Sequence, residues 1–368
     1  MDEFIIEGTT LIKYRGSASH ITLPEGITEI GKYAFLTCDS ATSITVPDGV
    51  RKISRSAFLA CRILESISLP TSLIELENNA FCGCTKLREV ILPDGITRIE
   101  PFTFADCTSL EEVQLPNDLE WIAWKAFFNC TSLTGIDFPN KIKWIGIEAF
   151  SGCERLEQVI LPDSITDINA EAFSGCKNLC HVHLPEQLTR LCEGTFYQCR
   201  NLTRIDIPAN VRNLSFGAFW DCDNLRLIII HSKKIELCGF GTLYGLHTTG
   251  PIKKAAIVLT HFQQVPGEMR TKILCGFAYM YSQNQVTKEQ CEAYLPYIRR
   301  NARYLYWIFE EDENMLNLMV AEQMIPKEDV SDLVEKLSKK GMHEAVVTLL
   351  NYHTPEKHLD SAMDALYI

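Results

Sequence analysis

The sequence predicts an α/β repeat solenoid of parallel strands, built from nine 23-residue repeats and followed by an all-α helical domain. The first observation is a strict period: Pro, Phe and Cys each recur nine times, and every gap is 23 residues. The second is a short segment of alternating apolar and polar residues before each of these prolines, which is the pattern of a half-buried strand. The third is a change of pattern after Ile230, where the period ends and helical signals begin. Self-similarity at a period in the twenties is typical of solenoids.

Each repeat contains a strand, a turn and an apolar arc. In the strand, apolar residues such as Val113 and Leu115 alternate with polar ones, and the following Pro ends it because proline has no N–H to donate. An Asp-Gly or similar pair then turns the chain. Two isoleucines follow, Ile96 and Ile99 in the fourth repeat, and then Ala-Phe-x-x-Cys, which suits a short helical turn with Phe in the core. Stacked repeats would therefore place a parallel sheet on one side and columns of apolar residues inside.

These residues carry a family resemblance. The pattern LPxxIxxIxxxAFxxCxxLxxVxLP over residues 20–230 resembles the leucine-rich repeats of the BspA type, also called the Treponema pallidum type. The resemblance implies a curved solenoid whose first repeat is covered by a capping hairpin within residues 1–23. It also implies no catalytic motif, and it points to relatives that are bacterial surface proteins binding host proteins. The C-terminal segment 330–350 is loosely similar to an ankyrin-like helix pair.

The predicted domains are an N-terminal cap at residues 1–23, a leucine-rich repeat domain at 24–250 and an α-helical domain at 251–368. In the last domain, Thr287–Gln290 has the pattern of a capping box, Pro326 suits a first helical position and Gly341 a helix end. Another helix is expected from Thr354, and we expect six to eight helices in total. The helices are expected to cap the end of the array and to offer a second binding surface. An aromatic helical core is predicted from Tyr304, Tyr306, Trp307 and Phe309.

Composition narrows the functional class. The formal net charge is −12, with −9 on residues 1–250 and −3 on residues 251–368, so a nucleic-acid partner is disfavoured. No apolar run approaches the ~18 residues of a membrane span, which argues against membrane insertion. The acidic start Met1–Glu7 is unlike a signal peptide. We therefore expect a cytoplasmic protein, or a surface or secreted one if an upstream signal was removed.

The chain has fifteen cysteines, and nine of them belong to the period. A chain of this length does not depend on disulfides to fold, and a buried free Cys behaves as a small hydrophobe. We therefore predict reduced, structural thiols. Neighbouring repeats lie about 5 Å apart, so a disulfide between adjacent thiols of the column is the alternative.

The first candidate binding site is aromatic. Five residues after the repeat prolines, seven of nine repeats carry a polar residue, but two neighbouring repeats carry Trp121 and Trp144. Three residues further on, the same repeats carry Trp124 and Ile147. Exposed apolar clusters mark contacts and Trp is favoured in them, so these residues predict a partner-binding patch away from the strand face. The alternative is that the Trp rings lie flat on the repeat surface or contact the C-terminal domain.

The second candidate site is the outward face of the predicted strands, which is mixed and mostly neutral. A metal site at its two histidines would need a third strong ligand, so we interpret the face as a polar surface. Its candidate residues are Glu112, Gln114, Asp137, Gln158, His181, His183, Arg204 and Asp206.

The sequence contains no nucleotide-binding, nucleophile-elbow or zinc-protease motif. We therefore predict no catalytic residues, no cofactor and no metal. The leading hypothesis is a non-enzymatic scaffold that binds an unidentified protein partner through the solenoid surface. The first alternative is a bacterial surface adhesin that binds host proteins. The second is a carbohydrate-binding module that uses Trp121 and Trp144 to stack on sugars.

Overall fold

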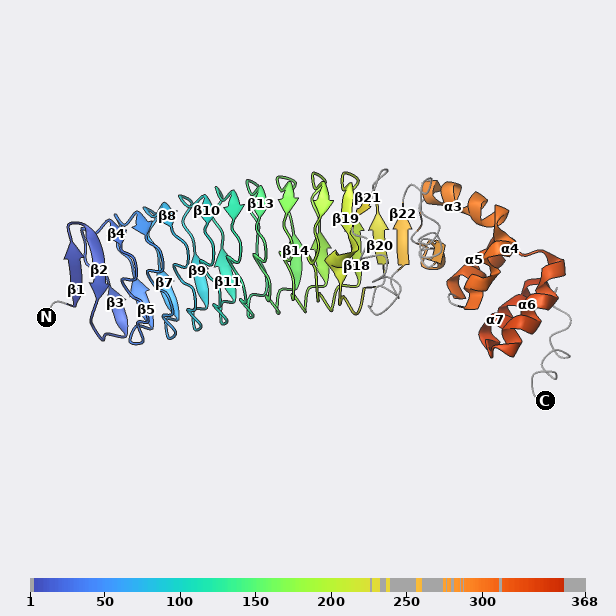
Figure 1. Ribbon diagram of the computed structural model, residues 1–368, viewed down its shortest axis with the longest axis horizontal. Helices are drawn as coiled ribbons and strands as arrows, with labels where there is room; N and C mark the ends of the chain where they lie inside the picture. The colour runs from blue at the N-terminus through green and yellow to red at the C-terminus, as the bar shows by residue number, and fades with distance from the viewer. Residues whose placement is uncertain are drawn as a thin grey trace. The chain divides into compact units, whose positions relative to one another are not determined.

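The computed structural model describes most of the repeat array and part of the C-terminal region, and the chain divides into two compact units, Met1–Lys254 and Ala255–Ile368. Figure 1 shows the first unit as a stack of strand-bearing turns and the second as mainly helical. The described residues are 3–225, 227–231, 236–238, 256–259, 274–275, 277–278, 281–284, 286, 288–310 and 313–353.

The first unit begins with the hairpin that the resemblance implied. Strand β1 (Phe4–Glu7) pairs antiparallel with β2 (Thr10–Tyr14), and Gly8 between them has a φ of 61°. Strand β2 then pairs in parallel with β4 (Glu29–Ile30), and the centroid of the Tyr14 ring lies 5.2 Å from that of the Phe35 ring. The hairpin therefore extends both the sheet and the internal aromatic column to the N-terminal end.

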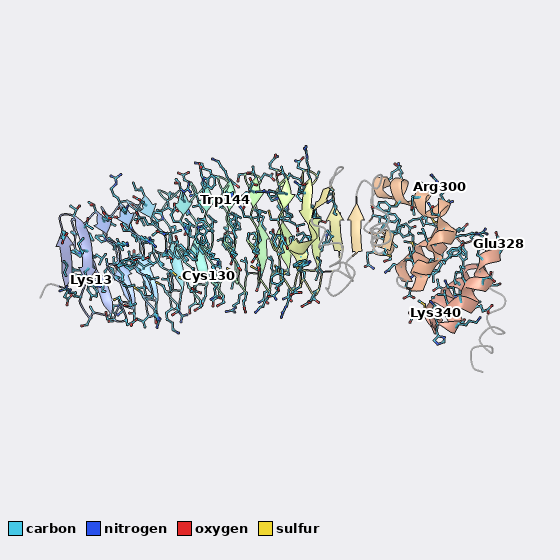
Figure 2. The ribbon with its side chains drawn as sticks, in the orientation of Figure 1. Lys13, Cys130, Trp144, Arg300, Glu328 and Lys340 are labelled. Carbon is cyan, nitrogen blue, oxygen red and sulfur yellow. The ribbon has the colours of Figure 1, made fainter. Side chains whose placement is uncertain are left out.

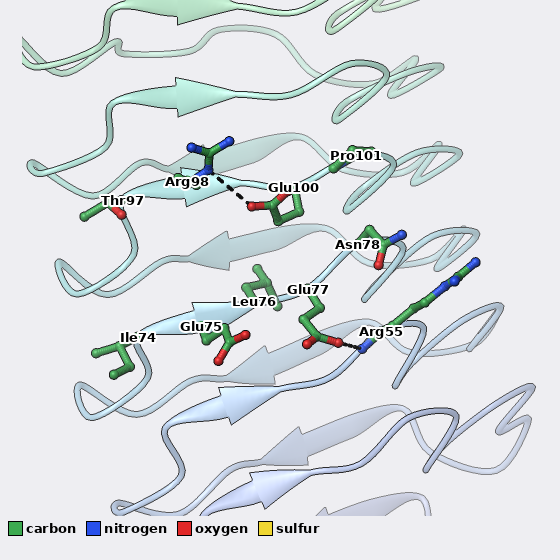
Figure 3. A pocket seen from close by; sticks show the side chains of 10 residues that line it. All are labelled: Arg55, Ile74, Glu75, Leu76, Glu77, Asn78, Thr97, Arg98, Glu100 and Pro101. Atoms are coloured by element: carbon green, nitrogen blue, oxygen red, sulfur yellow. Dashed lines mark hydrogen bonds and ion pairs between the residues drawn. The ribbon is translucent and has the colours of Figure 1, made fainter.

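Each repeat except the one at residues 135–137 contributes two short strands, which run in opposite directions on opposite sides of the coil (Figure 3). We call the parallel series before the prolines ladder 1 and the series after them ladder 2. The strands of ladder 1 are β3 (His20–Thr22), β5 (Ser43–Thr45), β7 (Ser66–Ser68), β9 (Glu89–Ile91), β11 (Glu112–Gln114), β14 (Gln158–Ile160), β16 (His181–His183), β18 (Arg204–Ile207) and β20 (Leu227–Ile230). The strands of ladder 2 are β4 (Glu29–Ile30), β6 (Lys52–Ile53), β8 (Glu75–Leu76), β10 (Arg98–Ile99), β12 (Trp121–Ile122), β13 (Trp144–Ile145), β15 (Asp167–Ile168), β17 (Arg190–Leu191), β19 (Asn213–Ser215) and β21 (Glu236–Cys238).

The prediction of a sheet on one side only is therefore wrong, because the sequence analysis missed ladder 2. Each residue of ladder 2 pairs with the residue one repeat, or 23 positions, further on: Trp121 pairs with Trp144, and Trp144 pairs with Asp167. Both ladders have interruptions. Ladder 2 contains one continuous four-stranded sheet, β10-β12-β13-β15, while ladder 1 is interrupted at residues 135–137, where Gly135 has no side chain to pack.

The predicted helical turn at Ala-Phe-x-x-Cys is also wrong. The arc consists of successive turns, and two residues of it have positive φ, for example Lys125 (54°) and Asn129 (59°). Its backbone N–H groups alternate: the Phe104 N–H donates to the Ala126 carbonyl of the next repeat (2.8 Å), whereas the Ala105 N–H donates to the Phe102 carbonyl of the same arc (3.2 Å). A helix would direct all of these donors back along its own chain, so hydrogen bonds between stacked repeats take the place of a continuous helix. The ninth repeat is different and contains the 3₁₀ helix η1 (Phe216–Phe219).

The core between the ladders consists of repeated columns. Nine Phe rings, from Phe35 to Phe219, stack with centroids 5.0–6.0 Å apart and are almost completely buried. Eight thiols, from Cys61 to Cys222, each donate to the carbonyl oxygen of a Phe 26 residues earlier, at 3.0–3.4 Å. Figure 2 labels one of these buried thiols, Cys130. The column cysteines are free, as predicted, and their thiols satisfy carbonyl groups that would otherwise be buried without a partner.

The period continues beyond the point where the sequence analysis ended it. Strand β21 pairs in parallel with β19, and Asn213 lies beside Glu236, again 23 residues later. His231 occupies the place of the repeat proline in this turn. The stack of ladder 2 therefore extends through a tenth turn, at least to Cys238.

The second unit is helical, as predicted, apart from strand β22 (Ala256–Leu259). Its described helices are α3 (Lys288–Arg300), α4 (Ala302–Leu305), the 3₁₀ helix η3 (Tyr306–Glu310), α5 (Glu313–Ala321), α6 (Lys327–Lys339) and α7 (His343–His353). Pro326 is the residue before α6 rather than its first helical residue, and Gly341 ends that helix with a φ of 73°, as expected. Thr287 and the helix expected from Thr354 lie outside the described residues, so the helix count is not tested.

The aromatic core predicted for this unit is described in part. Phe309 is buried, whereas Tyr306 is half-buried and its hydroxyl donates to the Asp329 carboxylate (2.8 Å). Arg303 also pairs with that carboxylate, at 2.8 Å, and thereby ties α4 to α6. The side chains of Tyr304 and Trp307 lie outside the described part.

Candidate functional site

The outward side chains at the first position of each ladder 2 strand form one row along the coil, which we call the ladder 2 row. In the first four repeats these side chains alternate in charge: Glu29, Lys52, Glu75 and Arg98. The row then carries two Trp residues and resumes with Asp167 and Arg190. Ion pairs join neighbours in the charged parts, Lys52 with Glu75 at 3.0 Å and Asp167 with Arg190 at 3.2 Å. The Trp residues therefore interrupt a charged surface in the middle of the array.

Trp121 and Trp144 are neighbours and lie away from ladder 1, as the sequence predicted, but they lie on a second strand ladder that it did not predict. Their ring centroids are 5.4 Å apart and the planes are tilted by 46°. Both side chains are half-buried rather than fully exposed. Figure 2 labels Trp144 on the outside of the coil. The Arg98 guanidinium lies 5.2 Å from the Trp121 ring centroid, close enough for a cation–π contact.

Trp124 and Ile147 are the more accessible members of the cluster, with 47% and 49% of their surface exposed. The Phe102 ring meets Trp124 edge-on, with centroids 4.5 Å apart. Gly146 allows the close approach beneath, since a Cβ there would lie 2.5 Å from the Trp124 backbone nitrogen. We call Phe102, Trp121, Trp124, Trp144 and Ile147 the aromatic patch.

The sequence analysis found four members of the aromatic patch and missed Phe102. Phe102 occupies a position where the neighbouring repeats carry Asn79 and Lys125, so comparison of that column would have revealed it. It also missed the contact of Arg98 with Trp121, which requires the parallel register of ladder 2.

Ion pairs surround the aromatic patch. Glu120 pairs with Lys143 at 3.0 Å and Lys125 with Glu148 at 3.3 Å, in each case between the two Trp-bearing repeats. Arg98 pairs with Glu100 at 3.3 Å. Because these charges are neutralised within the chain, the patch presents apolar surface without a strong net charge at its rim.

A pocket of about 550 Å³ opens beside the aromatic patch, where ladder 2 is interrupted between β8 and β10 (Figure 3). Glu77 on its floor accepts hydrogen bonds from the Lys52 ammonium and from the Arg55 backbone N–H (2.7 Å). Burial alone would raise the pKa of Glu77, but these hydrogen bonds outweigh it and lower that pKa. Arg98 lines this pocket and also covers Trp121, so the pocket and the patch are adjacent.

The second candidate face lies on ladder 1, as predicted. Seven of its eight residues are exposed, and Asp206 is half-buried in a two-oxygen ion pair with Arg204 (3.1–3.3 Å). His181 and His183 both project from β16. Asp137 lies in the interrupted stretch, next to a hollow of about 650 Å³ that Glu112, Gln114 and Gln158 also line.

In the described part of the chain, no three His, Cys, Asp or Glu side chains are arranged to hold a metal ion. Burial raises the pKa of the column thiols from Cys84 to Cys222, to about 12 for Cys153 and Cys222, so these thiols remain protonated at neutral pH and are poor nucleophiles. No helix among the described residues is long and apolar enough to cross a membrane.

The fold and the site define a class of protein, a solenoid with two strands in each 23-residue turn and an outer surface that varies from repeat to repeat. The chain belongs to the family of BspA-type leucine-rich repeat regions, whose model matches residues 10–134 and 120–242 in six copies. Leucine-rich repeat proteins are in general scaffolds for protein interaction rather than known enzymes. No curated protein matches the chain in sequence.

Several solved structures are similar to this chain. A leucine-rich cell surface protein from Faecalibacterium prausnitzii is 23% identical, covering 72% of this chain and 94% of its own, with a TM-score of 0.40. The leucine-rich repeat protein of T. pallidum is 25% identical over 60% and 72%, with a TM-score of 0.26. The pneumococcal vaccine antigen PcpA is 15% identical over 73% and 92%, with a TM-score of 0.35. Since identity is 25% or less in each pair, the partner of this chain has to be argued from its own residues.

Proposed function

We propose that this chain is a non-enzymatic interaction protein that binds a protein partner through the aromatic patch. The observation that supports the proposal most is that a strictly repetitive array concentrates three Trp residues, Phe102 and Ile147 on one face of two neighbouring repeats and the turn before them. The fold does not require aromatic residues at these positions, because seven of nine repeats carry a polar residue at the position of Trp121 and Trp144, and four of nine do at the position of Trp124 and Ile147.

The physical setting of the patch suits protein recognition. Trp is enriched among residues that dominate binding energy, and such residues are usually surrounded by contacts that exclude water. Here the ion pairs Glu120–Lys143 and Lys125–Glu148 supply that rim. The backbone beneath is held by hydrogen bonds between repeats, so binding would order little additional chain.

Two other functions compete with this proposal. A carbohydrate would need flat, open aromatic platforms, whereas Trp121 and Trp144 are half-buried and tilted by 46° to each other. An adhesin role would place the same surface outside the cell, as the name of the F. prausnitzii protein indicates for that protein. An adhesin would be a protein-binding protein as well, so cell-surface labelling and host matrix baits distinguish it by location. A cytoplasmic location stays a prediction.

The test is affinity capture from a lysate of the source organism, with the wild-type chain and the double variant Trp121→Ser/Trp144→Ser. A matched control, His181→Ser/His183→Ser, changes two ring side chains on ladder 1 instead. Circular dichroism first checks that all three are folded. We expect a partner to be retained by wild type and control and lost by the Trp variant. Equal retention by all three would move the site away from the aromatic patch, and binding on a glycan array without any captured protein would favour the carbohydrate reading.

A further inference from the structure

In the ladder 2 row, the charged side chains nearest the Trp pair carry opposite charges at equal distances on either side of the midpoint between β12 and β13. Counting outward from that midpoint, Trp121 corresponds to Trp144, and the next residues are Arg98 on one side and Asp167 on the other. One repeat further out, the corresponding residues are Glu75 and Arg190. A cation on one side therefore corresponds to a carboxylate on the other at both steps.

The rows beside it follow the same rule. In the row one residue earlier, Glu120 corresponds to Lys143, and in the row four residues later Lys125 corresponds to Glu148. In the exposed apolar row, Trp124 corresponds to Ile147. In these rows charges thus correspond to opposite charges and Trp124 to an apolar side chain, whereas Phe102, further from the midpoint, corresponds to Glu171.

This arrangement is complementary to itself under a two-fold rotation. Consider an axis that runs along the strand direction, lies in the plane of contact and passes between β12 and β13. Rotation about it reverses the order of repeats but keeps each position within the strand, and both copies have the same repeat spacing. Arg98 of one copy then faces Asp167 of the other, and the reverse contact forms at the same time, as in every isologous interface.

We propose that the occupant of the aromatic patch is a second copy of this chain, docked by its own ladder 2 in this two-fold arrangement. This inference rests on the proposed function, because it uses the same patch and names its partner. The Trp pairs of the two copies would meet at the centre, and the charged positions would flank them. Trp124 of each copy would pack on Ile147 of the other.

The middle block of ladder 2 has the same symmetry. Ladder 2 is divided into the blocks β4-β6-β8, β10-β12-β13-β15 and β17-β19-β21, and the middle block has two strands on each side of the midpoint. A rigid block of four strands is therefore centred on the proposed axis.

The alternation of charge also has a role within one chain, where Lys52 pairs with Glu75 and Asp167 with Arg190. Arg98 takes no part in this cross-strand alternation. It faces no carboxylate on the next strand, since Trp121 stands there; its ion pair is with Glu100 of its own repeat, at 3.3 Å, and its side chain is 56% exposed above the Trp ring. Docking of a second copy would give this guanidinium a second carboxylate partner, Asp167, beside the aromatic patch.

The test measures self-association of the full-length chain by sedimentation velocity and light scattering across a concentration series. One chain has a mass of 41.7 kDa, and the wild type is expected to approach twice that mass as concentration rises. Arg98→Asp places two like charges opposite each other twice per dimer, so the dissociation constant should rise about tenfold or more. The double variant Arg98→Asp/Asp167→Arg restores opposite charges and should recover most of that loss. Arg88→Asp, a charge reversal on the other side of the coil, is the matched control and should dimerise like wild type.

Rescue by the double variant is the decisive outcome, since each single change could act through its own fold. A wild-type chain that stays monomeric up to about 100 µM, a concentration far above that of a typical specific complex, would overturn the second-copy inference. The same result would leave the proposed function standing if the lysate experiment still yields a partner that the Trp variant loses. Dimerisation that Trp121→Ser/Trp144→Ser leaves unchanged would overturn the inference too, because the dimer would then use another surface. Circular dichroism on every variant separates these outcomes from misfolding.

Discussion

The two ladders of this solenoid are made by the same repeat, yet their outer surfaces differ. Ladder 1 exposes mainly small or neutral polar residues, with single apolar side chains such as Ile91 and Ile160. Ladder 2 exposes alternating charges and, at its centre, the aromatic patch. Inside, both ladders rest on the same Phe and Cys columns. The core therefore imposes the 23-residue period. Outer residues that depart from the period are not needed for folding, so they are the candidates for binding.

The largest expected effect concerns the core that both ladders share. Phe104 is fully buried and stacks on a Phe ring on either side, at 5.5 and 5.3 Å. Phe104→Ala should lower the free energy of unfolding by about 3–5 kcal/mol, because it removes buried apolar atoms and leaves a cavity. Urea unfolding followed by circular dichroism measures this change. Ile91→Ser, at a side chain 63% exposed on ladder 1, is the control and should stay within about 0.5 kcal/mol.

If Phe104→Ala lowered the free energy of unfolding as little as the Ile91→Ser control does, the Phe column would be too loosely packed to impose the 23-residue period. Residues on the outer surface that depart from the period could then no longer be contrasted with a core that requires it.

A smaller effect is expected at the centre of ladder 2. Trp144 is half-buried against Trp121, so Trp144→Ser should cost about 1–2 kcal/mol of folding stability. Gln158→Ser, at an exposed position on ladder 1, should change stability by less than about 0.5 kcal/mol. Both values come from the same unfolding experiment. A cost for Trp144→Ser equal to that of Phe104→Ala would mean that the Trp pair is a structural element, and the case for a binding surface would weaken.

The core was predictable from sequence because the period and burial coincide. Ladder 2 was not, because its strands are two or three residues long and too short to show alternation. In Ile96-x-x-Ile99 the spacing of three looks helical, although Ile99 lies in strand β10. The arc was misread for another reason. Residues such as Lys125 adopt positive φ without being glycine, and the glycines that do mark the column of Asn129, at Gly83, Gly152 and Gly175, were not compared.

The candidate site was predictable to the extent that it departs from the repeat. Column comparison showed Trp121 and Trp144 directly, since the other seven repeats carry polar residues there. The partner of each side chain was not predictable, because Arg98 meets Trp121 only through the register of ladder 2. The tenth turn was missed since His231 replaces the repeat proline, and only the pairing of Asn213 with Glu236 reveals it.

The smallest expected effect is a pH dependence specific to ladder 2. The Glu77 carboxylate lies 2.6 Å from the Lys52 ammonium and its side chain is 32% exposed. The pKa of Glu77 is lowered from its ordinary value of 4.5, so the pair stabilises the fold above about pH 4.5 and that contribution is lost as the pH falls through the folded-state pKa. Partial exposure limits the contribution to about 1 kcal/mol or less.

Glu77→Gln should therefore be less stable than wild type at pH 7, and the difference should shrink towards zero as the pH approaches 3. Thermal unfolding at a series of pH values measures it, with Glu112→Gln on ladder 1 as the matched control. Glu112 is exposed and forms no ion pair among those found in the described residues, so its removal should have a weaker and flatter effect. An equal pH dependence for both variants would mean that the ion pairs of ladder 2 contribute no more than isolated surface carboxylates. The stability of the fold would then not depend on the ion pairs of ladder 2, and its charged side chains could pair with a second chain without lowering the free energy of unfolding.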